Sequence, residues 1–249
     1  MTRSAMNARF FPEVGAGGFS RIDSTIQFYQ RVNSLLHRDF VVFDFGAGRG
    51  AAHIDDPVPY RHELLCLKGK VRKIIGADVD PIVETNPVID ERIVLGSEGH
   101  IPLADRSIDM VISDFTFEHI GDPQKVASEL DRILVPGGWI CARTPNRYGY
   151  IAIANRLVPN NIRRQILRLA QPDRNDEDVF PAVYRLNTPG TLRHYFDPSR
   201  YDHFVYPWDA EPAYHAGSAI LYRLFLIVHA VTPNICKTLL LIFLRKKRG

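Results

Sequence analysis

The sequence of 249 residues predicts an α/β fold in which helices cover both faces of a parallel sheet. Near-continuous apolar runs alternate with helical or loop segments, as the buried strands of parallel sheets do. Small or acidic residues follow each apolar run, and ligands bind at that edge of an open α/β sheet. The first half of the chain is therefore expected to bind a nucleotide-type ligand.

Composition places the chain among ordinary globular proteins. The length suits one large domain, and the apolar content of 45% with a charged content of 24% is typical of such proteins. A net charge of +3 is too slight to indicate a nucleic-acid partner. The three cysteines are widely spaced, so neither a disulfide framework nor a metal site is expected. With no apolar leader in residues 1–11, a cytoplasmic setting is predicted.

The first half yields an ordered set of elements. Residues 1–20 are expected to form a flexible arm, and a helix should run from Ser20 or Asp23 to about His37. The segment of about Ala51–Lys70 is interpreted as an insertion around the first crossover helix. Strands are predicted at Phe40–Phe45, Val71–Ala77, Arg92–Leu95, Ile108–Ile112 and Trp139–Arg143, and a helix at about Pro123–Leu134, before the turn at Pro136–Gly138.

The second half is less regular. Ile151–Ala170 has a helical pattern that Pro159 interrupts, and residues 171–200 are polar. Tyr201–Trp208 is predicted as a sixth strand, Ser218–Val231 as an apolar helix and Thr238–Leu244 as a last strand. The helix around Phe28–Asn33 and the segment of about 147–235 are expected to roof the ligand pocket, the latter as a lid or insertion.

A glycine-rich turn after the first strand is the strongest functional signal. Phe40–Phe45 leads into Gly46, Gly48 and Gly50, whose missing β-carbons let the backbone approach a ligand and permit positive φ angles. The pattern is G-x-G-x-G followed by alanine, so the dinucleotide fingerprint G-x-G-x-x-G is only partly met.

Asp78 ends the second strand, where its two carboxylate oxygens can accept hydrogen bonds from two ribose hydroxyls. Asp80 is interpreted as a turn residue, because Asp-Pro is itself a turn signal. A nicotinamide-dependent oxidoreductase would use the same loop and acid, although Gly50-Ala51 fits its third glycine poorly. A glycosyltransferase with a metal-binding acid pair would leave the glycines unexplained. A catalytically silent cofactor-binding protein is a further alternative.

Several stretches resemble, in the right order, the motifs of class I S-adenosylmethionine-dependent methyltransferases, and more closely their type 11-like domain. The resemblance spans roughly residues 40–146 and implies a Rossmann-like, seven-stranded, mostly parallel sheet with a reversed final strand. It also implies S-adenosyl-L-methionine as the methyl donor. Residues 1–39 would then precede a methyltransferase domain at 40–249. The matching stretches are Val42–Gly50, Ile75–Asp80, Ile101–Phe115 with Glu118–Ile120, and Pro136–Trp139.

The resemblance also implies a cofactor site. Asp44 would lie near the amino-acid end of the cofactor, the glycines beside its methionine and ribose, and Asp78 on the ribose. Ser97 and Glu98 stand where the family places an acid near the adenine amino group, with serine at the usual position of that acid. The expected cofactor-binding residues are Asp44, Gly46, Ala47, Gly48, Gly50, Asp78, Val79, Ser97, Glu98 and Ser113.

Catalytic and acceptor residues are harder to predict, because positioning and deprotonation supply most of the catalysis of methyl transfer. Asp114 and His119 are the candidate bases, each with a structural role as the alternative. The candidate acceptor contacts are Asn146, Tyr150, Tyr184 and Arg185. No Asp/Asn-Pro-Pro-Tyr/Phe motif follows the fourth strand, which disfavours methylation of nucleic-acid bases. A small-molecule, glycan or lipid-linked acceptor, methylated on oxygen, is expected.

The apolar helix at Ser218–Val231 is too short to span a bilayer. A place in the core is the preferred interpretation. The alternative is a weak contact with a membrane surface, made by this helix together with the basic tail Arg245–Arg248.

Overall fold

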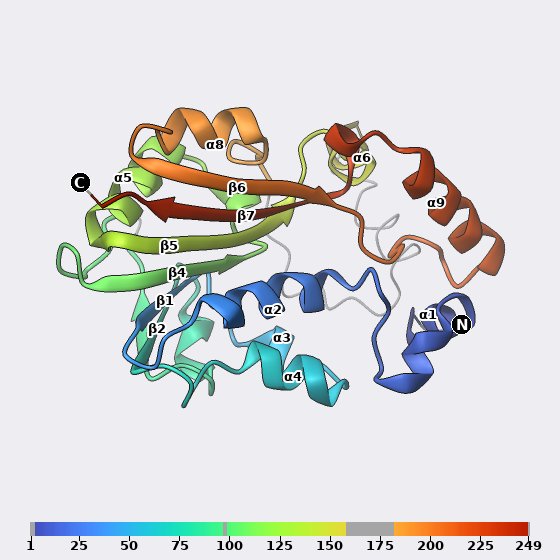
Figure 1. Ribbon diagram of the computed structural model, residues 1–249, viewed down its shortest axis with the longest axis horizontal. Helices are drawn as coiled ribbons and strands as arrows, with labels where there is room; N and C mark the ends of the chain where they lie inside the picture. Colours follow the sequence, from blue (N-terminus) through green and yellow to red (C-terminus); the bar gives the residue numbers. More distant parts are fainter. Residues whose placement is uncertain (1–2, 97–98, 158–181, 249) are drawn as a thin grey trace.

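The computed structural model describes residues 3–96, 99–157 and 182–248, and its centre is a seven-stranded sheet (Figure 1). The strand order is β3-β2-β1-β4-β5-β7-β6. Strands β1 to β5 are mutually parallel, whereas β7 is antiparallel to both of its neighbours, which confirms the predicted reversed final strand. The strands are β1 Val41–Phe45, β2 Lys73–Asp78, β3 Glu91–Val94, β4 Ile108–Asp114, β5 Leu134–Pro145, β6 Tyr201–Trp208 and β7 Leu239–Lys246.

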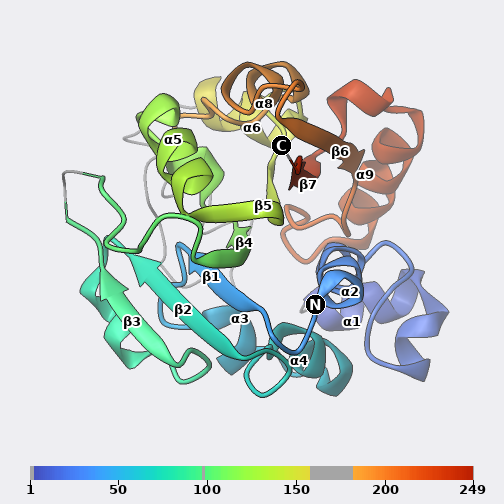
Figure 2. The ribbon, with the colours of Figure 1, turned by 60° about the vertical axis from the view of Figure 1, so that its left-hand side comes forward.

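Helices cover both faces of the sheet because its central strands are apolar on both sides (Figure 2). In β1, Phe43 packs into one apolar cluster together with residues of α5 (Pro123–Ile133) and α8 (Pro189–Tyr195). Val42 packs into the opposite cluster with residues of α2 (Ser24–Leu35) and α4 (Pro59–Leu65). Phe43 and Val42 are both fully buried, so this strand is anchored from two sides.

The predicted helix at residues 20–37 is α2. Its start is fixed by Asp23, whose carboxylate accepts hydrogen bonds from the backbone N–H groups of Thr25 and Ile26 at 2.8 and 3.1 Å. The other oxygen of Asp23 binds Arg61 of α4 at 2.6 Å. The segment interpreted as an insertion therefore consists of the short helices α3 (Ala51–Ile54) and α4, of which α4 is tied to α2.

The turn expected before the fifth strand lies within the span of β5. Ile108 pairs with Leu134, yet Met110 already pairs with Trp139, so the residues between them bulge out of register. A side chain at Gly138 would lie 2.8 Å from the carbonyl oxygen of Asp109. The glycines therefore permit a bulge inside the strand, and the predicted strand start at Trp139 is too late.

The expectation of a flexible N-terminal arm is wrong for residues 3–16. These residues form α1 (Arg3–Phe10) and the 3-10 helix η1 (Pro12–Ala16). Met6 is fully buried, and the Phe10 ring stacks on Tyr222 with ring centroids 4.8 Å apart. The Tyr222 hydroxyl donates to Asn7 Oδ1 at 2.7 Å. The arm is therefore held by α9 (Ala219–Val231), far away in the sequence.

The second half confirms the predicted strands and separates the two segments of the alternative membrane contact, the apolar helix and the basic tail. Helix α6 (Tyr150–Leu157) begins the predicted helix at 151–170, whose remainder lies outside the described residues. Helix α9 lies at one end of the sheet, whereas β7 carries the basic tail to the opposite end (Figure 1). The preferred interpretation of α9 as a core helix is wrong, because Tyr222 is its one buried residue.

Candidate functional site

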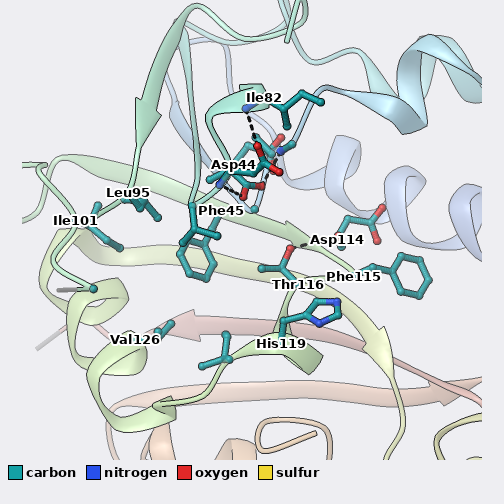
Figure 3. A pocket seen from close by; sticks show the side chains of 18 of the residues that line it. Asp44, Phe45, Ile82, Leu95, Ile101, Asp114, Phe115, Thr116, His119 and Val126 are labelled. Atoms are coloured by element: carbon teal, nitrogen blue, oxygen red, sulfur yellow. Dashed lines mark hydrogen bonds between the residues drawn. The ribbon is translucent and has the colours of Figure 1, made fainter. Parts of the chain in front are cut away.

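A cavity of about 800 Å³ opens at the edge of the sheet where the parallel strands end. Its walls come from the turns that follow β1, β2, β3 and β4, as expected for a ligand site in an open α/β sheet. Apolar side chains of Leu95, Ile101 and Val126 line one side, and Asp114, Phe115 and His119 line another (Figure 3). The cavity therefore joins an apolar compartment to one that carries polar and aromatic groups.

The glycine-rich turn is shaped by two different constraints. Gly46 has φ 84°, and a β-carbon there would lie 2.1 Å from the Thr116 hydroxyl oxygen. At Gly50, with φ 77°, it would lie 2.9 Å from Asn86 Oδ1. At Gly48, with φ 48°, the nearest atom would be Asp78 Oδ2 at 3.9 Å. Gly46 and Gly50 thus allow close packing within the protein, whereas Gly48 leaves space in the cavity.

The carboxylate of Asp78 organises the turns on either side of it. Its Oδ2 accepts a hydrogen bond from the Gly48 N–H at 2.9 Å, and its Oδ1 accepts one from the Asp80 N–H at 3.0 Å. Asp80 in turn caps the 3-10 helix η2 (Pro81–Thr85) by accepting from the Ile82 N–H at 2.9 Å. Asp78 lines the cavity with lone pairs left for a ligand, and Asp80 takes the turn role predicted from Asp-Pro.

Asp44 is the most perturbed carboxyl group that lines the cavity. Its pKa is raised to about 7, mainly by desolvation and also by the nearby carboxylates of Asp114 and Asp78. A cationic ligand group beside Asp44 would relieve this cost. The site is therefore electrostatically suited to bind positive charge at the end of β1.

Asp114 is held by an ion pair rather than left available as a base. Arg143 Nε and a terminal guanidinium nitrogen donate to its two oxygens at 2.7 and 2.6 Å. The Tyr29 hydroxyl of α2 also donates to Asp114, at 3.4 Å. Arg143 is 4% exposed and binds Ser24 Oγ and Thr25 Oγ1, both at 3.0 Å. The structure therefore favours a positioning role for Asp114 over the predicted role of base.

His119 and Phe115 belong to the same side of the cavity (Figure 3). His119 lies in the 3-10 helix η3 (Phe117–His119), and its side chain is 28% exposed. Phe115 has φ 56°, a left-handed conformation that is strained for an aromatic residue, and its ring lies 4.8 Å from the guanidinium of Arg143. Phe115 is 41% exposed, so it offers an apolar surface in the wall of the cavity that His119 also lines.

Glu118, which is next to His119 in the sequence, is buried and ties the site to a distant segment. Its Oε2 accepts from the Thr144 hydroxyl at 2.7 Å, and its backbone carbonyl accepts from the N–H groups of Val183 and Tyr184. Burial raises the pKa of Glu118 to about 7. The Glu-His-Ile stretch thus supplies both a structural anchor and a group that lines the cavity.

The four predicted acceptor contacts lie outside the cavity walls. Asn146 is buried, donates to the carbonyls of Ile235 and Lys237 at 2.8 Å, and accepts from the Tyr148 N–H. The Tyr150 hydroxyl bonds to His229 of α9 at 3.1 Å. Asn146 therefore forms the turn after β5, and Tyr150 packs α6 onto α9.

Tyr184 and Arg185 also have structural roles. Tyr184 is 3% exposed and left-handed, with φ 54°. Arg185 donates to the carbonyl of Gly121, a residue of the cavity wall, at 2.5 Å. Arg185 thus supports the rim of the cavity, and neither side chain is among its lining residues.

Of the predicted cofactor contacts, Asp44, Gly46, Ala47, Gly48, Asp78 and Val79 line the cavity. Gly50 does not line it, because its position is fixed by packing against Asn86. The Ser113 hydroxyl donates to the carbonyl of Phe45 at 3.0 Å and is fully buried, so Ser113 joins β4 to the end of β1 instead. Ser97 and Glu98 lie outside the described residues.

The roles of Arg143 and of Thr116, which packs against Gly46, were not predicted from the sequence. Arg143 was predicted only as the end of a strand, yet β4 and β5 place it directly opposite Asp114 in register. A basic residue that ends one apolar run, with an acid that ends the preceding run, was the available signal. Tyr29 of α2 lines the cavity, so the helix around Phe28–Asn33 contributes to its wall.

Comparisons with known proteins find similarity to methyltransferases. Residues 60–142 match a family model described as "Methyltransferase domain". A curated "Probable S-adenosylmethionine-dependent methyltransferase" of Mycolicibacterium smegmatis is 32% identical over 125 residues, 48% of this chain and 43% of that protein. A malonyl-[acyl-carrier protein] O-methyltransferase of Coxiella burnetii is 30% identical over 115 residues, 46% of this chain and 37% of the relative. The chain thus spans less than half the length of these relatives.

Solved structures share the fold. A chain in the complex between the Haloferax volcanii Trm112 methyltransferase activator and a methyltransferase is similar with a TM-score of 0.55 and 15% identity. The similarity covers 98% of this chain and 96% of that one. The structural neighbour shows that the fold is shared, and the family match covers residues 60–142, about a third of the chain. In this region the chain is similar to S-adenosylmethionine-dependent methyltransferases.

S-adenosyl-L-methionine is the cofactor that this family implies, and the residues present fit it. The space at Gly48 admits a ligand close to the backbone, and Asp78 has acceptor capacity for hydroxyl groups. The raised pKa of Asp44 marks a place where positive charge is favoured. The volume of the cavity leaves room for an acceptor beside a cofactor.

Proposed function

We propose that this protein transfers a methyl group from S-adenosyl-L-methionine to a hydroxyl group of a small-molecule, glycan or lipid-linked acceptor. One observation carries the proposal: a single cavity holds the Gly48–Asp78–Asp44 group and the Phe115–His119 group. The first group fits a cofactor, and the second offers a titratable imidazole and an apolar surface for an acceptor. Transfer requires that donor and acceptor share one enclosed space.

On the cofactor side, the protein binds and orients. When bound, the cofactor supplies a methyl group activated by its attachment to a positively charged sulfur. Asp78 would accept hydrogen bonds from the ribose hydroxyls, while its own contacts with Gly48 and Asp80 hold the carboxylate in place. Asp44 would counter the positive charge of the cofactor. Leu95, Ile101 and Val126 would enclose the adenine ring in apolar surroundings.

On the acceptor side, His119 is the proposed base. An imidazole titrates near neutral pH and can take the proton that a hydroxyl group loses as it is methylated. Asp114, neutralised by Arg143, would keep the adjacent turn and Phe115 in position. The exposed Phe115 ring would contact the apolar or sugar face of the acceptor. A cytoplasmic location and the absence of a nucleic-acid partner remain predictions from the sequence.

The test is transfer of labelled methyl from the cofactor into fractionated cell extract. We expect a labelled small molecule, glycan or lipid whose mass increases by one methyl group on an oxygen atom. The Asp78→Ala variant should label the same product more slowly. Saturable binding of the cofactor without a labelled product in any fraction would instead identify a catalytically silent binding protein. Tight binding of NAD in its place would identify an oxidoreductase.

A further inference from the structure

Helix α9 exposes an apolar stripe to solvent. Ile220, Leu224, Ile227 and Val231 follow each other at spacings of three or four residues, so they share one face of the helix. Their exposed fractions are 82%, 53%, 55% and 75%. Ile235, just beyond the helix, is 64% exposed. Isolated apolar residues are common on protein surfaces, but a continuous stripe of large ones marks an interaction site.

The opposite face of α9 is already occupied. Tyr222 is buried between Phe10 and the ring of His215, and Phe225 stacks on Tyr150 of α6 at 5.5 Å. The helix is therefore apolar on two sides, of which the body of the protein covers one. The stripe is not required for packing the helix onto the domain.

The described segments that form the stripe and α1, which packs against its helix, carry charged side chains of one sign. No Asp or Glu occurs between Pro212 and Gly249, or between Met1 and Pro12 of the segment that packs against α9. Arg223 is exposed beside the stripe and lies over the Phe10 ring at 5.9 Å, and Arg9 of α1 is also exposed. Asp209 and Glu211, which precede α9, accept hydrogen bonds from Thr238 and Ser20. An anionic surface would complement this region.

The stripe lies at the same edge of the sheet as the cavity. Both β5 and β6 are antiparallel to β7, so β6 runs in the same direction as β1 to β5. The connection from β6 to β7, which contains α9, therefore starts at the carboxyl edge where the cavity opens (Figure 1). The basic tail follows β7, whose eight residues carry the chain about 25 Å toward the other edge.

We propose that α9 docks on the surface of an anionic membrane, with the stripe in the interface and Arg223 and Arg9 beside the lipid headgroups. A helix binds such a surface in the plane of the bilayer when its apolar side chains enter the interface and its cations attract anionic lipids. The described part of the chain contains no helix with the length and apolarity to cross a membrane. The tail, at the opposite edge, does not take part. If the proposed methyl transfer is correct, this orientation brings a lipid-linked acceptor to the cavity.

The test is co-flotation of the full chain with vesicles at low salt. Vesicles of phosphatidylcholine with phosphatidylglycerol should carry the protein, and vesicles of phosphatidylcholine alone should carry less. Ile227→Glu should reduce the bound fraction at least about tenfold, because it replaces an inserted side chain by a charge. Ile54→Glu is the matched control, since Ile54 is 49% exposed on α3, and it should leave flotation unchanged.

A second pair of variants tests the charge. Arg223→Gln should weaken binding to anionic vesicles about fivefold, with no effect of Arg106→Gln at the amino edge of β4. Thermal unfolding checks that all variants are folded. Absence of flotation for the folded wild-type chain, or equal losses for Ile54→Glu and Ile227→Glu, would overturn the proposal. So would a dimer in light scattering that Ile227→Glu dissociates, because the stripe would then join two copies. Cofactor binding is measured separately, so its failure is distinguishable.

Discussion

Arg143 binds both carboxylate oxygens of Asp114, at 2.7 and 2.6 Å, across directly paired positions of β5 and β4. The same guanidinium bonds to Ser24 and Thr25 at the start of α2 and lies over the rings of Phe28 and Phe115. This ion pair therefore joins the ends of β4 and β5, which border the cavity, to helix α2.

Removal of Arg143 should destabilise the protein severely. Arg143→Leu leaves Asp114 without its partner in a largely buried place, and such losses cost about 3–5 kcal/mol. Urea unfolding measures the change. Arg200→Leu is the control, because Arg200 pairs with Asp131 but its side chain is 60% exposed, and about 0–1 kcal/mol is expected. Equal effects of the two substitutions would show that the buried pair has no special structural role.

Gly46 and Gly48 should respond differently to alanine. Gly46→Ala should unfold the chain or destabilise it by about 2 kcal/mol or more, because the new methyl group overlaps Thr116 at a positive φ. Gly48→Ala meets open space in the cavity, so the strain of its left-handed backbone, about 1 kcal/mol, is the main cost.

Binding of the cofactor gives a second test of the role of Gly48. Gly48→Ala should weaken binding of S-adenosyl-L-methionine at least about tenfold while the protein stays folded, as measured by calorimetry alongside thermal unfolding. A folded Gly48→Ala variant that binds the cofactor like the wild type would show that the backbone at Gly48 does not contact it.

Cofactor binding should depend on pH through Asp44. With a pKa of about 7, the Asp44 carboxyl is largely protonated in mildly acidic solution and cannot counter positive charge. The dissociation constant for S-adenosyl-L-methionine should therefore increase as the pH falls from 8 to 6, and binding at pH 7 should release protons. Asp44→Asn should bind weakly with no such dependence. An unchanged pH dependence in Asp44→Asn would assign the effect to another group.

The same carboxyl should affect stability without cofactor. The folded pKa exceeds the ordinary value of 3.8, so the folded state retains the proton longer than the unfolded state. Stability contributed at this position is thus lost as the pH rises from about 4 to 7. Asp44→Asn should therefore stabilise the cofactor-free protein at pH 8 by about 1–2 kcal/mol, since water in the cavity moderates the cost of burial. Denaturation at pH 4 and pH 8 checks this, and a loss of stability at pH 8 would contradict it.

His119→Asn should slow methyl transfer while cofactor affinity stays close to that of the wild type. Loss of a general base lowers kcat by about 10²–10⁴. The acid limb of the pH–rate profile should also disappear, an effect that a structural change alone would not produce. A variant that retains both kcat and the acid limb would show that the acceptor loses its proton directly to water.

The elements that could be predicted from the sequence are those in which local pattern and burial agree. The apolar runs of β1 and β4 are buried on both faces, so their composition identifies them without knowledge of their neighbours. The turn at Gly46–Gly50 could be predicted because glycines permit its positive φ angles, and Asp78 because it ends the neighbouring strand. By contrast, Asn146 was expected to face an acceptor because it follows the fifth strand, and Tyr150 because it lies in the segment expected to roof the pocket. Their hydrogen-bond partners instead come from residues 229–237.

Contacts between residues that are distant in the sequence explain the other differences between the predictions and the structure. Residues 1–20 were expected to form a flexible arm, but Met6 is buried in a cluster with Tyr222, and the partly buried Phe10 stacks on the same ring, more than two hundred positions away. The ion pair of Asp114 with Arg143 depends on the register between two strands, which the sequence of either strand does not specify. Composition indicated that α9 is apolar, but not which face the domain leaves exposed.

The central claim is that the cavity at the ends of β1 and β2 binds S-adenosyl-L-methionine through Asp78. Calorimetric titration of the wild-type, Asp78→Ala and Asp80→Ala chains with this cofactor tests it most directly, with NAD as the comparison ligand. We predict saturable binding to the wild type, a loss of at least about tenfold in Asp78→Ala, a small change in Asp80→Ala and no binding of NAD. Tight binding of NAD without binding of S-adenosyl-L-methionine would contradict the account.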